Sequence, residues 1–480
     1  MCSFLLLRSK TAPSDELLNV ANRYARFRGP DRTTTQRCVD AHGWHLTLLH
    51  NLLDISGTAA PQPIVSGPSL GTMAVFNGEI YNYRQLGDFR CDTDCILPSY
   101  TEAGCHISQL LDGEFSIVVW DSTRSQITIA VDPFLTKPLY WSLDFETGTF
   151  GAGTCASSLR QTGLEDIRLM RPNSTLQIRF STDQATVTEL PGQFEFSLAQ
   201  TADSYDDWNA AFLESVSKRA LHGSHRPVVY LSSGYDSGAI CAALNTLGIQ
   251  YDTFSIAAGE NRQLLEQRIR LNRRATGARA FVSKGMNPDE VAKVRAEIRE
   301  TVEPFRYVHE DQPGCINSLQ NDGGAIGAFF LAEWARREGR VVNLSGAGAD
   351  EIISDYGWNG QKYYYHSQFG GLFPADLEGF FPWRKFYDDT QRSYLFKDEY
   401  ILGRHGIEGR YPFLDRSVVQ KFLTLSPELK NRCYKAPIEQ FLRLHKYPFE
   451  EARKRGFSPA LDTAPTSALG RILKRLRIFG

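Results

Sequence analysis

One segment constrains the fold of this chain more than any other: an apolar run that leads into a loop of small residues and then into a helical stretch. The run Val228-Val229-Tyr230-Leu231 has the apolar, β-branched character of a buried strand. It continues into Ser232-Ser233-Gly234-Tyr235-Asp236-Ser237, and helical spacing follows over Gly238–Leu247. A buried strand that passes through a short loop into a helix is the building unit of a parallel α/β sheet. The sequence therefore predicts a parallel α/β domain here.

The same loop has the chemistry of a phosphate site. Backbone N–H groups of such a loop and of the helix N-terminus present donors and partial positive charge to an anion, and the hydroxyls of Ser232, Ser233 and Ser237 add donors. Asp236 would repel a bare phosphate, so we expect a magnesium ion between the two. The lysine of a Walker A loop is absent. A simple strand–turn–helix connection is the alternative interpretation.

A second loop repeats this pattern. The segment Val342-Asn343-Leu344 is a predicted buried strand, and Ser345-Gly346-Ala347-Gly348-Ala349-Asp350-Glu351 follows it with small residues and acids. Because the carboxyl ends of parallel strands meet at one edge of a sheet, Asp236 and Asp350 are predicted to share a magnesium ion over one ligand crevice.

The first part of the chain has a different pattern. Up to about Thr188, short β-like runs are separated by turn residues, and Ser14–Phe27 has helical spacing. The runs are Thr72–Phe76, Phe115–Asp121, Gln126–Val131 and Ser174–Phe180. This pattern predicts an α+β domain with much antiparallel sheet. The expected organisation is a first domain at 1–188, a linker at 189–205 and an α/β domain at 206–480, which suits 480 residues at roughly 100–200 per domain.

Composition excludes several classes of protein. The 53 basic and 55 acidic residues give a net charge of −2, which argues against an overall basic nucleic-acid-binding surface. No apolar run approaches the roughly 18 residues needed to span a membrane, and no signal-peptide core is visible, so a cytoplasmic protein is expected. Nine scattered cysteines form neither a disulfide framework nor a zinc set. The sequence leaves the assembly state open, with a homodimer among the options.

The N-terminal pattern Met1-Cys2 supplies a nucleophile. Removal of Met1 would leave a thiol and an α-amine on one residue, and an amine with a pKa of about 8 is a base for its own thiol. The segment Phe76–Asn82 begins at a strand end and carries the amide of Asn77 and the N–H of Gly78, which are the donors of an oxyanion hole.

Taken together and in order, these segments resemble the glutamine-dependent asparagine synthetase family. That family joins an N-terminal-nucleophile (Ntn) glutaminase sandwich to an α/β pyrophosphatase-loop synthetase domain. The segments that carry the resemblance are Met1-Cys2, Arg28–Asp31, Asn77–Asn82, Asp94, Asp112–Phe115, Asp132–Tyr140, Ser232–Ser237, Ser345–Glu351, Glu408–Asp415 and Lys435. The resemblance implies an enzyme that uses ATP and magnesium to activate a substrate carboxylate as an acyl-adenylate, and amidates it with ammonia from glutamine.

The resemblance also implies roles for residues of the first domain. Cys2 would attack the side-chain amide of glutamine, and Asn77 and Gly78 would stabilise the oxyanion. The implied glutamine-binding residues are Arg28, Asn77, Gly78, Glu79 and Asp94, the last of which would pair with the α-amine. Ammonia would then travel inside the protein to the second domain.

In the second domain, pyrophosphate would be released into the Ser232–Ser237 loop. Lys435 would neutralise the developing negative charge, and Glu408 is predicted as a further catalytic acid or base. Asp236 and Asp350 are the predicted metal ligands. The predicted ATP-binding residues are Leu231, Ser232, Ser233, Gly234, Asp236, Ser237, Ile256, Ser345 and Gly346.

Three positions depart from the family pattern. Leu49 stands where the family has an arginine for the glutamine carboxylate, and only His50 or Arg28 is available to replace it. Ala347 replaces the acid found in members that use aspartate, so aspartate is expected to be a poor acceptor. Ser233 replaces a glycine, which is a mild change.

Two alternatives therefore stay open. One is a ligase that uses a different amine nucleophile, as β-lactam synthetases do, and the other is a non-catalytic relative. Intact Asp236, Asp350 and Lys435 argue against the non-catalytic relative, whereas intact Cys2 and Asn77 argue against the loss of glutamine chemistry.

Overall fold

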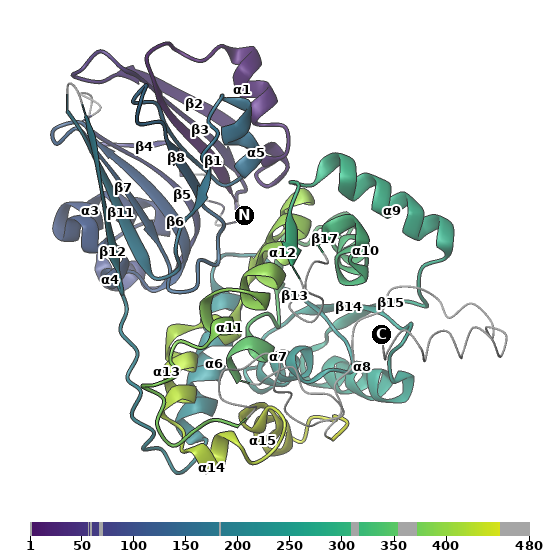
Figure 1. The fold of residues 1–480 in the computed structure, drawn as a ribbon. Helices are drawn as coiled ribbons and strands as arrows, with labels where there is room; N and C mark the ends of the chain where they lie inside the picture. Colours follow the sequence, from purple (N-terminus) through teal and green to yellow (C-terminus); the bar gives the residue numbers. More distant parts are fainter. Residues whose placement is uncertain are drawn as a thin grey trace.

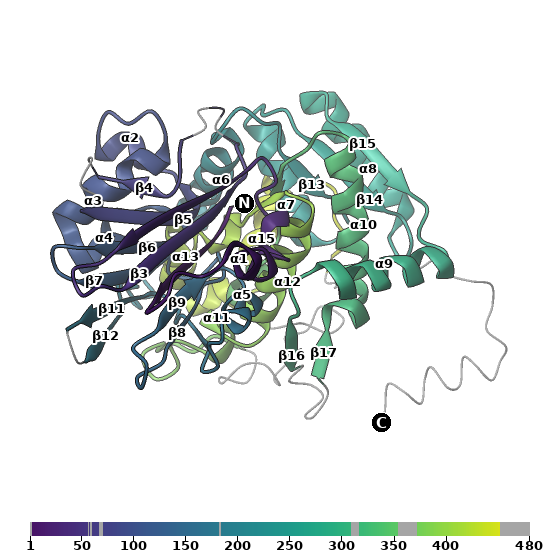
Figure 2. The ribbon, with the colours of Figure 1, turned by 90° about the horizontal axis from the view of Figure 1, so that it is seen from above.

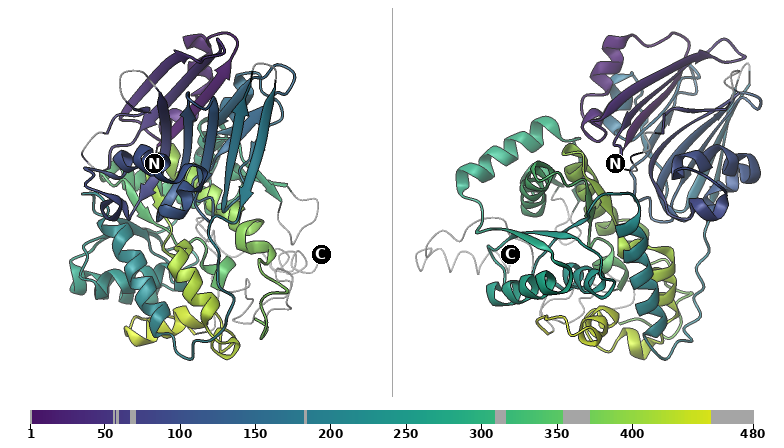
Figure 3. Two further views of the ribbon diagram at one scale, coloured as in Figure 1. Left: turned by 90° about the vertical axis from the view of Figure 1, so that its left-hand side faces the viewer. Right: turned by 180° about the vertical axis from the view of Figure 1, so that it is seen from behind.

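The computed structural model describes residues 2–55, 57, 60–66, 71–181, 184–308, 316–353 and 372–451. The described chain forms a β-sandwich followed by an α/β domain, and Figure 1 shows the sandwich above the second domain. The chain begins where the two domains meet, as the views from the front and from behind agree (Figures 1 and 3). This position matters because Cys2 is the predicted nucleophile.

Within the described residues, the sandwich consists of two antiparallel sheets of six strands each. The first sheet has the order β10-β8-β9-β1-β3-β2 and the second has the order β12-β11-β7-β6-β5-β4. The first contains β1 (Ser3–Ser9), β2 (Arg32–Val39), β3 (His45–Leu52), β8 (Tyr140–Leu143), β9 (Phe150–Gly153) and β10 (Arg168–Leu169). The second contains β4 (Ile64–Val65), β5 (Thr72–Ile80), β6 (Gly113–Asp121), β7 (Gln126–Val131), β11 (Ser174–Phe180) and β12 (Ala185–Pro191).

Side chains alternate between the two faces of each sheet, as strand geometry requires. In β1, Phe4 and Leu6 pack in the core between the sheets, whereas Leu5 and Leu7 pack outward against α1 (Asp15–Ala21) and α5 (Ala156–Gln161). The outer face of the second sheet packs against α3 (Ile96–Ala103), beside the short helices α2 (Tyr83–Leu86) and α4 (Ile107–Leu110). The first domain is therefore a four-layer sandwich.

The second domain is built on a five-stranded parallel sheet with the order β15-β14-β13-β18-β19. Its strands are β13 (Val228–Tyr230), β14 (Asp252–Ile256), β15 (Arg279–Ser283), β18 (Val342–Leu344) and β19 (Glu408–Arg410). One face packs against α10 (Gly323–Arg337) and α12 (Thr390–Arg404), and the other against α6 (Asp206–Leu221), α7 (Tyr235–Thr246) and α15 (Ala436–Leu444). Figure 2 shows this sheet beside the sandwich.

The remaining elements surround this core. They are α8 (Arg262–Thr276), α9 (Pro288–Thr301), the hairpin of β16 (Arg306–Val308) and β17 (Ile316–Ser318), α11 (Arg384–Tyr387), α13 (Arg416–Thr424) and α14 (Pro427–Lys430). Among the helices that the structure describes, none is both long enough and apolar enough to cross a bilayer.

The predicted fold class is confirmed, and the corrections concern the ends of elements. The helix predicted over 14–27 ends at Ala21, because Asn22 caps it and turns its buried side chain toward Asn51, to which its Nδ2 donates at 3.0 Å. Helix α7 begins at Tyr235, earlier than the predicted Gly238. Asp236 and Ser237 therefore lie in the first turn of a helix and not in the loop.

Candidate active sites in the two domains

The structure brings together three of the predicted residues at the carboxyl ends of the parallel strands. The Nζ atom of Lys435 donates to Oδ1 of Asp236 at 2.6 Å and lies 3.0 Å from Oδ1 of Asp350. Burial alone would lower the pKa of Lys435, but the two carboxylates hold it well above its usual value. A buried ammonium ion thus bridges two acids that lie 114 residues apart in the chain.

The phosphate loop is held by its own serines. Ser237 Oγ accepts the N–H of Ser232 at 3.1 Å, and Ser232 Oγ accepts the N–H of Gly234 at 3.1 Å. The N–H of Ser233 donates to Oε2 of Glu260 at 2.6 Å. A carboxylate therefore already lies on a backbone donor of this loop, which is the behaviour expected of an anion site.

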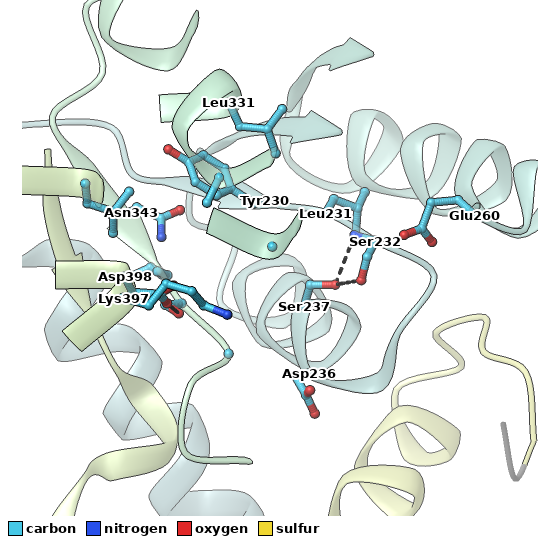
Figure 4. A pocket seen from close by; sticks show the side chains of 16 residues that line it. Tyr230, Leu231, Ser232, Asp236, Ser237, Glu260, Leu331, Asn343, Lys397 and Asp398 are labelled. Carbon is cyan, nitrogen blue, oxygen red and sulfur yellow. Dashed lines mark hydrogen bonds between the residues drawn. The ribbon is translucent and has the colours of Figure 1, made fainter. Parts of the chain in front are cut away.

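A cavity of about 270 Å³ opens beside the loop. Figure 4 shows Ser232, Ser237 and Glu260 on one side of it and Tyr230, Asn343, Lys397 and Asp398 on the other. The cavity is lined by Tyr230, Leu231, Ser232, Asp236, Ser237, Glu260, Gly324, Ala328, Leu331, Asn343, Leu344, Ser345, Gly346, Lys397, Asp398 and Leu402. Predicted ATP-binding residues Ser233, Gly234 and Ile256 are not among them, and Ile256 is buried in the core.

Two buried polar atoms of the cavity wall have no hydrogen-bond partner within the described chain. They are the hydroxyl of Tyr230 and Oδ1 of Asn343, and the Asn343 side chain is almost fully buried. In the same cavity lining, Ser345 Oγ donates to Oδ2 of Asp398 at 2.6 Å. Burial raises the pKa of Asp398. The cavity thus combines an apolar wall with polar atoms that a ligand could satisfy.

Gly346 fits this site because two chain segments approach closely. A Cβ atom at Gly346 would lie 2.7 Å from the Cβ of Asp236. Any larger residue would push the two predicted metal ligands apart, since Asp350 follows on the same segment as Gly346.

In the first domain, Cys2 extends the inward-facing row of Phe4 and Leu6 to the open end of the sandwich. Its Sγ lies 4.0 Å from the carbonyl oxygen of Leu53. Burial raises the pKa of the Cys2 thiol to about 11, and the carboxylates of Glu408 and Glu79 act in the same direction. Glu408 belongs to the second domain, so Cys2 lies near the domain interface, while Met1 lies outside the described residues.

Asn77 and Gly78 lie on β5 and have the properties expected of an oxyanion hole. The Asn77 side chain is fully buried, and neither its Nδ2 nor its Oδ1 has a hydrogen-bond partner among the described residues. Gly78 has a φ of +133°, and a Cβ there would lie 1.9 Å from the carbonyl oxygen of Glu114. Only glycine fits at this position, and the buried amide of Asn77 has unused donor capacity.

Glu79 and Glu408 meet at the domain interface. His222 Nε2 lies 2.5 Å from Oε2 of Glu79, Arg410 Nη2 lies 3.3 Å from Oε1 of Glu79, and Arg410 Nε donates to Oε1 of Glu408 at 2.7 Å. Burial and then Glu408 raise the pKa of Glu79 to about 7. Glu408 lies at the amino end of β19, so the structure places it toward Cys2 and away from the nucleotide loops.

Charged residues predicted for glutamine binding are engaged elsewhere in this structure. Arg28 donates from Nη2 to Oε2 of Glu399 at 2.7 Å and from Nε to the carbonyl oxygen of Cys2 at 3.3 Å. Asp94 forms a two-armed pair with Arg90, with Arg90 Nε donating to Oδ2 at 2.9 Å.

Neither position 49 nor position 50 supplies a cation. Leu49 packs outward in the cluster under α1, whereas His50 faces the inner layer, where its Nε2 lies 3.3 Å from the carbonyl oxygen of Phe76. Burial lowers the pKa of His50 to about 3, so its ring is neutral.

Several residues at these sites were not predicted from the sequence. They are Tyr230, Asn343, Lys397 and Asp398 in the cavity, Glu260 on the loop, and Lys137, His222 and Glu399 at the interface. Tyr230, Asn343 and Lys137 lay in segments that the sequence singled out, but no role was predicted for them. Charged and buried pairs between distant segments carry no local sequence signal.

Comparison with known proteins defines the class of the two domains. Residues 1–189 match the family described as "Glutamine amidotransferase domain", and residues 207–385 match "Asparagine synthase". A nucleophile at the end of a sandwich and a phosphate loop at the edge of a parallel sheet are the sites that these two domain types would need.

Two curated relatives at low identity have names that fit both domains. The chain is 25% identical over 424 residues to a putative glutamine-hydrolysing asparagine synthetase of Methanocaldococcus jannaschii, over 81% of this chain and 72% of that protein. It is 28% identical over 389 residues to one of Mycobacterium bovis, over 70% of this chain but only 56% of that protein. A solved phosphoribosylpyrophosphate amidotransferase from B. subtilis has a TM-score of 0.32 at 10% identity, covering 73% of this chain and 77% of that one.

The chain is therefore a glutamine amidotransferase domain joined to an asparagine synthase domain. The curated relatives at 24–28% identity are named glutamine-hydrolysing asparagine synthetases, and the chain is a divergent relative of them.

Proposed function

We propose that this protein is an ATP-dependent amidotransferase that activates a carboxylic acid as an acyl-adenylate and amidates it with ammonia from glutamine. The observation that carries the proposal is the arrangement of Lys435 between Asp236, which lines the cavity, and Asp350. One lysine and two carboxylates beside a serine-rich loop fit the transfer of a nucleotidyl group. The lysine can neutralise phosphate charge directly, whereas the two carboxylates would do so only by holding a magnesium ion.

The nucleotide would lie in the cavity with its base on the apolar wall. Leu331, Ala328 and Leu402 supply that wall, and the unpartnered atoms of Tyr230 and Asn343 offer hydrogen bonds to a base or a sugar. Pyrophosphate would occupy the loop at 232–237, with Ser345 and Gly346 on the opposite side. Lys435 would then exchange its contacts with the two carboxylates for a contact with the phosphate.

Asp236 and Asp350 would hold magnesium. Two carboxylates that a single Nζ atom bridges at 2.6 and 3.0 Å are close enough to share one cation, and oxygen ligands suit magnesium. When bound, the ion would screen the phosphates from the carboxylates.

In the first domain, Cys2 would attack the glutamine amide while Asn77 and Gly78 stabilise the oxyanion. Glutamine use is expected to be weak, because Arg28 is engaged with Glu399 and His50 is neutral. Loss of one charge-assisted contact costs roughly 1.5–3 kcal/mol, or about ten- to a hundred-fold in affinity. Arg28, Glu79, Asp94 and Glu408 remain proposed site residues in this scheme.

The acceptor is proposed to be a carboxylic acid other than aspartate. Ala347, beside Ser345 in the second loop, has only a methyl group and supplies neither a base nor a charge. Asp398 is the nearest supported candidate for proton transfer, since it lines the cavity and burial raises its pKa.

The domain limits 1–188, 189–205 and 206–480 are part of the proposal. The start of α6 at Asp206 supports the second limit, whereas β12 runs to Pro191, three residues past the first limit. Residues 452–480 lie outside the described part of the chain. We also propose small-molecule substrates and a cytoplasmic location, without nucleic-acid or membrane partners and with homodimerisation left open.

The test is product analysis by mass spectrometry. The full chain is incubated with ATP, magnesium and a panel of carboxylic acids including aspartate, with either glutamine or ammonia as nitrogen donor. We expect AMP, pyrophosphate and an amide, with aspartate a poor acceptor. Cys2→Ala should lose the glutamine-driven reaction and retain the ammonia-driven one, whereas Asp236→Asn should lose both.

Each alternative has its own outcome in this experiment. AMP formation with an amine acceptor but with neither nitrogen donor would favour a ligase that uses a different amine nucleophile. Efficient turnover of aspartate, on the order of 1–10³ per second, would overturn the acceptor assignment. Unchanged pyrophosphate release by Asp236→Asn would overturn the assignment of the loop.

A further inference from the structure

A buried arginine lies directly behind the phosphate loop. Arg268, in the middle of α8, is fully buried. Its Nη1 donates to the carbonyl oxygens of Ser232 at 2.6 Å and Gly234 at 2.7 Å, and its Nε donates to the carbonyl oxygen of Pro448 at 2.9 Å. The guanidinium group therefore holds three backbone carbonyl groups, two of which belong to the loop.

The first turn of α7 packs against the same guanidinium group. A Cβ atom at Gly238 would lie 2.8 Å from Nη2 of Arg268 and 2.9 Å from its Cζ. The ring centroid of Tyr447 lies 5.3 Å from Cζ. A methyl group at position 238 would thus displace the guanidinium group, since that group is the part free to give way.

The charge of Arg268 is unusual for so buried a group. Its Nη2 has no hydrogen-bond partner in the described ranges of the chain. Burial lowers the pKa of Arg268, although the carboxylates of Glu260 and Asp236 act in the opposite direction. A buried cation is costly unless an anion lies close to it. A phosphate group on the other side of the loop would be such an anion.

The hydrogen bonds to Arg268 fix the direction of two peptide groups. In a trans peptide the carbonyl and the following N–H point in opposite directions. Because the carbonyls of Ser232 and Gly234 point back to Arg268, the N–H groups of Ser233 and Tyr235 point forward. The N–H and the hydroxyl of Ser233 both donate to the carboxylate of Glu260. Glu260 therefore marks the anion position on the front of the loop.

We propose that Arg268 is a positioning residue for pyrophosphate binding. It holds the carbonyls of Ser232 and Gly234 and so aims the N–H groups of Ser233 and Tyr235 at phosphate oxygens, while its charge attracts the anion from behind. This inference rests on the proposed nucleotide role of the loop and assigns the group that keeps the loop in its binding conformation.

The test measures binding of inorganic pyrophosphate with magnesium by calorimetry, and ATP–pyrophosphate exchange kinetics, on the full chain. Arg268→Met should weaken pyrophosphate binding about ten- to a hundred-fold, as expected for lost hydrogen bonds from a charged group. It should raise KM for ATP more than it lowers kcat. Arg268→Lys keeps the charge and should recover part of the affinity.

Two further variants separate positioning from stability. Gly238→Ala leaves Arg268 in the chain but displaces its guanidinium group, and alanine favours a helix more than glycine does. It should weaken pyrophosphate binding, with a smaller loss of thermal stability than Arg268→Met because the guanidinium group stays in the chain and helix propensity rises. The matched control is Arg270→Met on the same helix, since Arg270 is exposed and lies 3.8 Å from Glu266. It should bind pyrophosphate within about twofold of the wild type, as expected of an exposed substitution.

Wild-type affinity for pyrophosphate in both Arg268→Met and Gly238→Ala would overturn the inference, whatever happens to thermal stability. If Arg268→Met does not fold, Arg268→Lys and Gly238→Ala decide the question by the same measurement. If the wild type itself binds neither ATP nor pyrophosphate, the proposed function fails, and this inference fails with it.

Discussion

Replacing Glu399 with glutamine should destabilise the contact between the two domains. The Glu399 side chain is fully buried in α12, and it accepts hydrogen bonds from Arg28 Nη2 at 2.7 Å, Lys137 Nζ at 2.9 Å and the hydroxyl of Tyr411 at 2.7 Å. Arg28 and Lys137 belong to the sandwich, so one carboxylate pairs with two cations across the interface. Glutamine has almost the same shape but no charge.

The size of the expected loss in unfolding free energy depends on the contacts that Lys137 and Arg28 retain in the Glu399→Gln variant. Lys137 would retain a hydrogen bond to the carbonyl oxygen of Gly409 at 2.7 Å and a carboxylate oxygen of Glu114 at 3.8 Å. Arg28 would retain the main-chain carbonyl of Glu399 at 2.8 Å. Breaking a buried ion pair by removing one partner costs about 3–5 kcal/mol. Because both cations keep a contact, we expect a loss at the lower end of that range.

The assay is urea unfolding of the full chain followed by tryptophan fluorescence. The matched control is Glu333→Gln on α10, because Glu333 pairs with Arg337 on the protein surface, where such pairs contribute about 0–1 kcal/mol. A loss of stability in Glu399→Gln no larger than in this control would refute the reasoning. It would mean that the interface does not depend on the buried charge.

Two further predictions concern the pH dependence of the first site. Burial raises the pKa of Cys2 to about 11, so its alkylation by iodoacetamide should accelerate about tenfold per pH unit from pH 7 to 10, and a plateau below pH 9 would contradict this. Burial alone would lower the pKa of His222. The neighbouring Glu79 and Asp92 outweigh this effect and raise the pKa from 6.5 to about 9. Its contribution to stability is therefore complete below pH 6.5 and is lost as the pH rises through 9. Urea unfolding should show the advantage of the wild type over His222→Gln disappearing by about pH 10, and a constant difference would speak against the pairing.

The sequence allowed the second site to be predicted because its residues belong to local patterns. Asp236 and Asp350 each follow a short apolar strand, and the geometry of a parallel sheet brings the ends of such strands together. Lys435 came from the resemblance, and the structure places it between the two acids. The boundaries of elements were less predictable, since the start of α7 at Tyr235 depends on how the loop is held and not on apolar spacing.

The interface could not be predicted in this way. Glu399 and Lys137 are separated by 262 residues, and Arg268 lies 36 residues from the loop carbonyl that it holds. Nothing in the neighbouring sequence distinguishes these residues from exposed charges on a helix or a turn. Their burial depends on two domains or two layers coming together, which is a property of tertiary structure only.

The short strand β19 connects the two sites. Glu408 begins the strand close to Cys2, and the carbonyl oxygen of Arg410 at its other end accepts the N–H of Ser345 in the second loop at 2.8 Å. Three residues span about 10 Å at roughly 3.3 Å each. Under the proposed function, we expect ammonia to pass beside this strand.

The charges along β19 affect whether ammonium or neutral ammonia can pass between the two sites. Unpaired carboxylates would retain ammonium, but each one here has a cationic partner: Glu408 and Glu79 have Arg410, and Glu399 has Arg28 and Lys137. Because these buried charges are paired, their net electric field does little to stabilise an ammonium ion. An ammonium ion would also lose its hydration shell on entering the interface. The interface therefore favours passage of neutral ammonia. Because Glu399 also joins the two domains, removing its charge should impair the glutamine-driven reaction more than the ammonia-driven one.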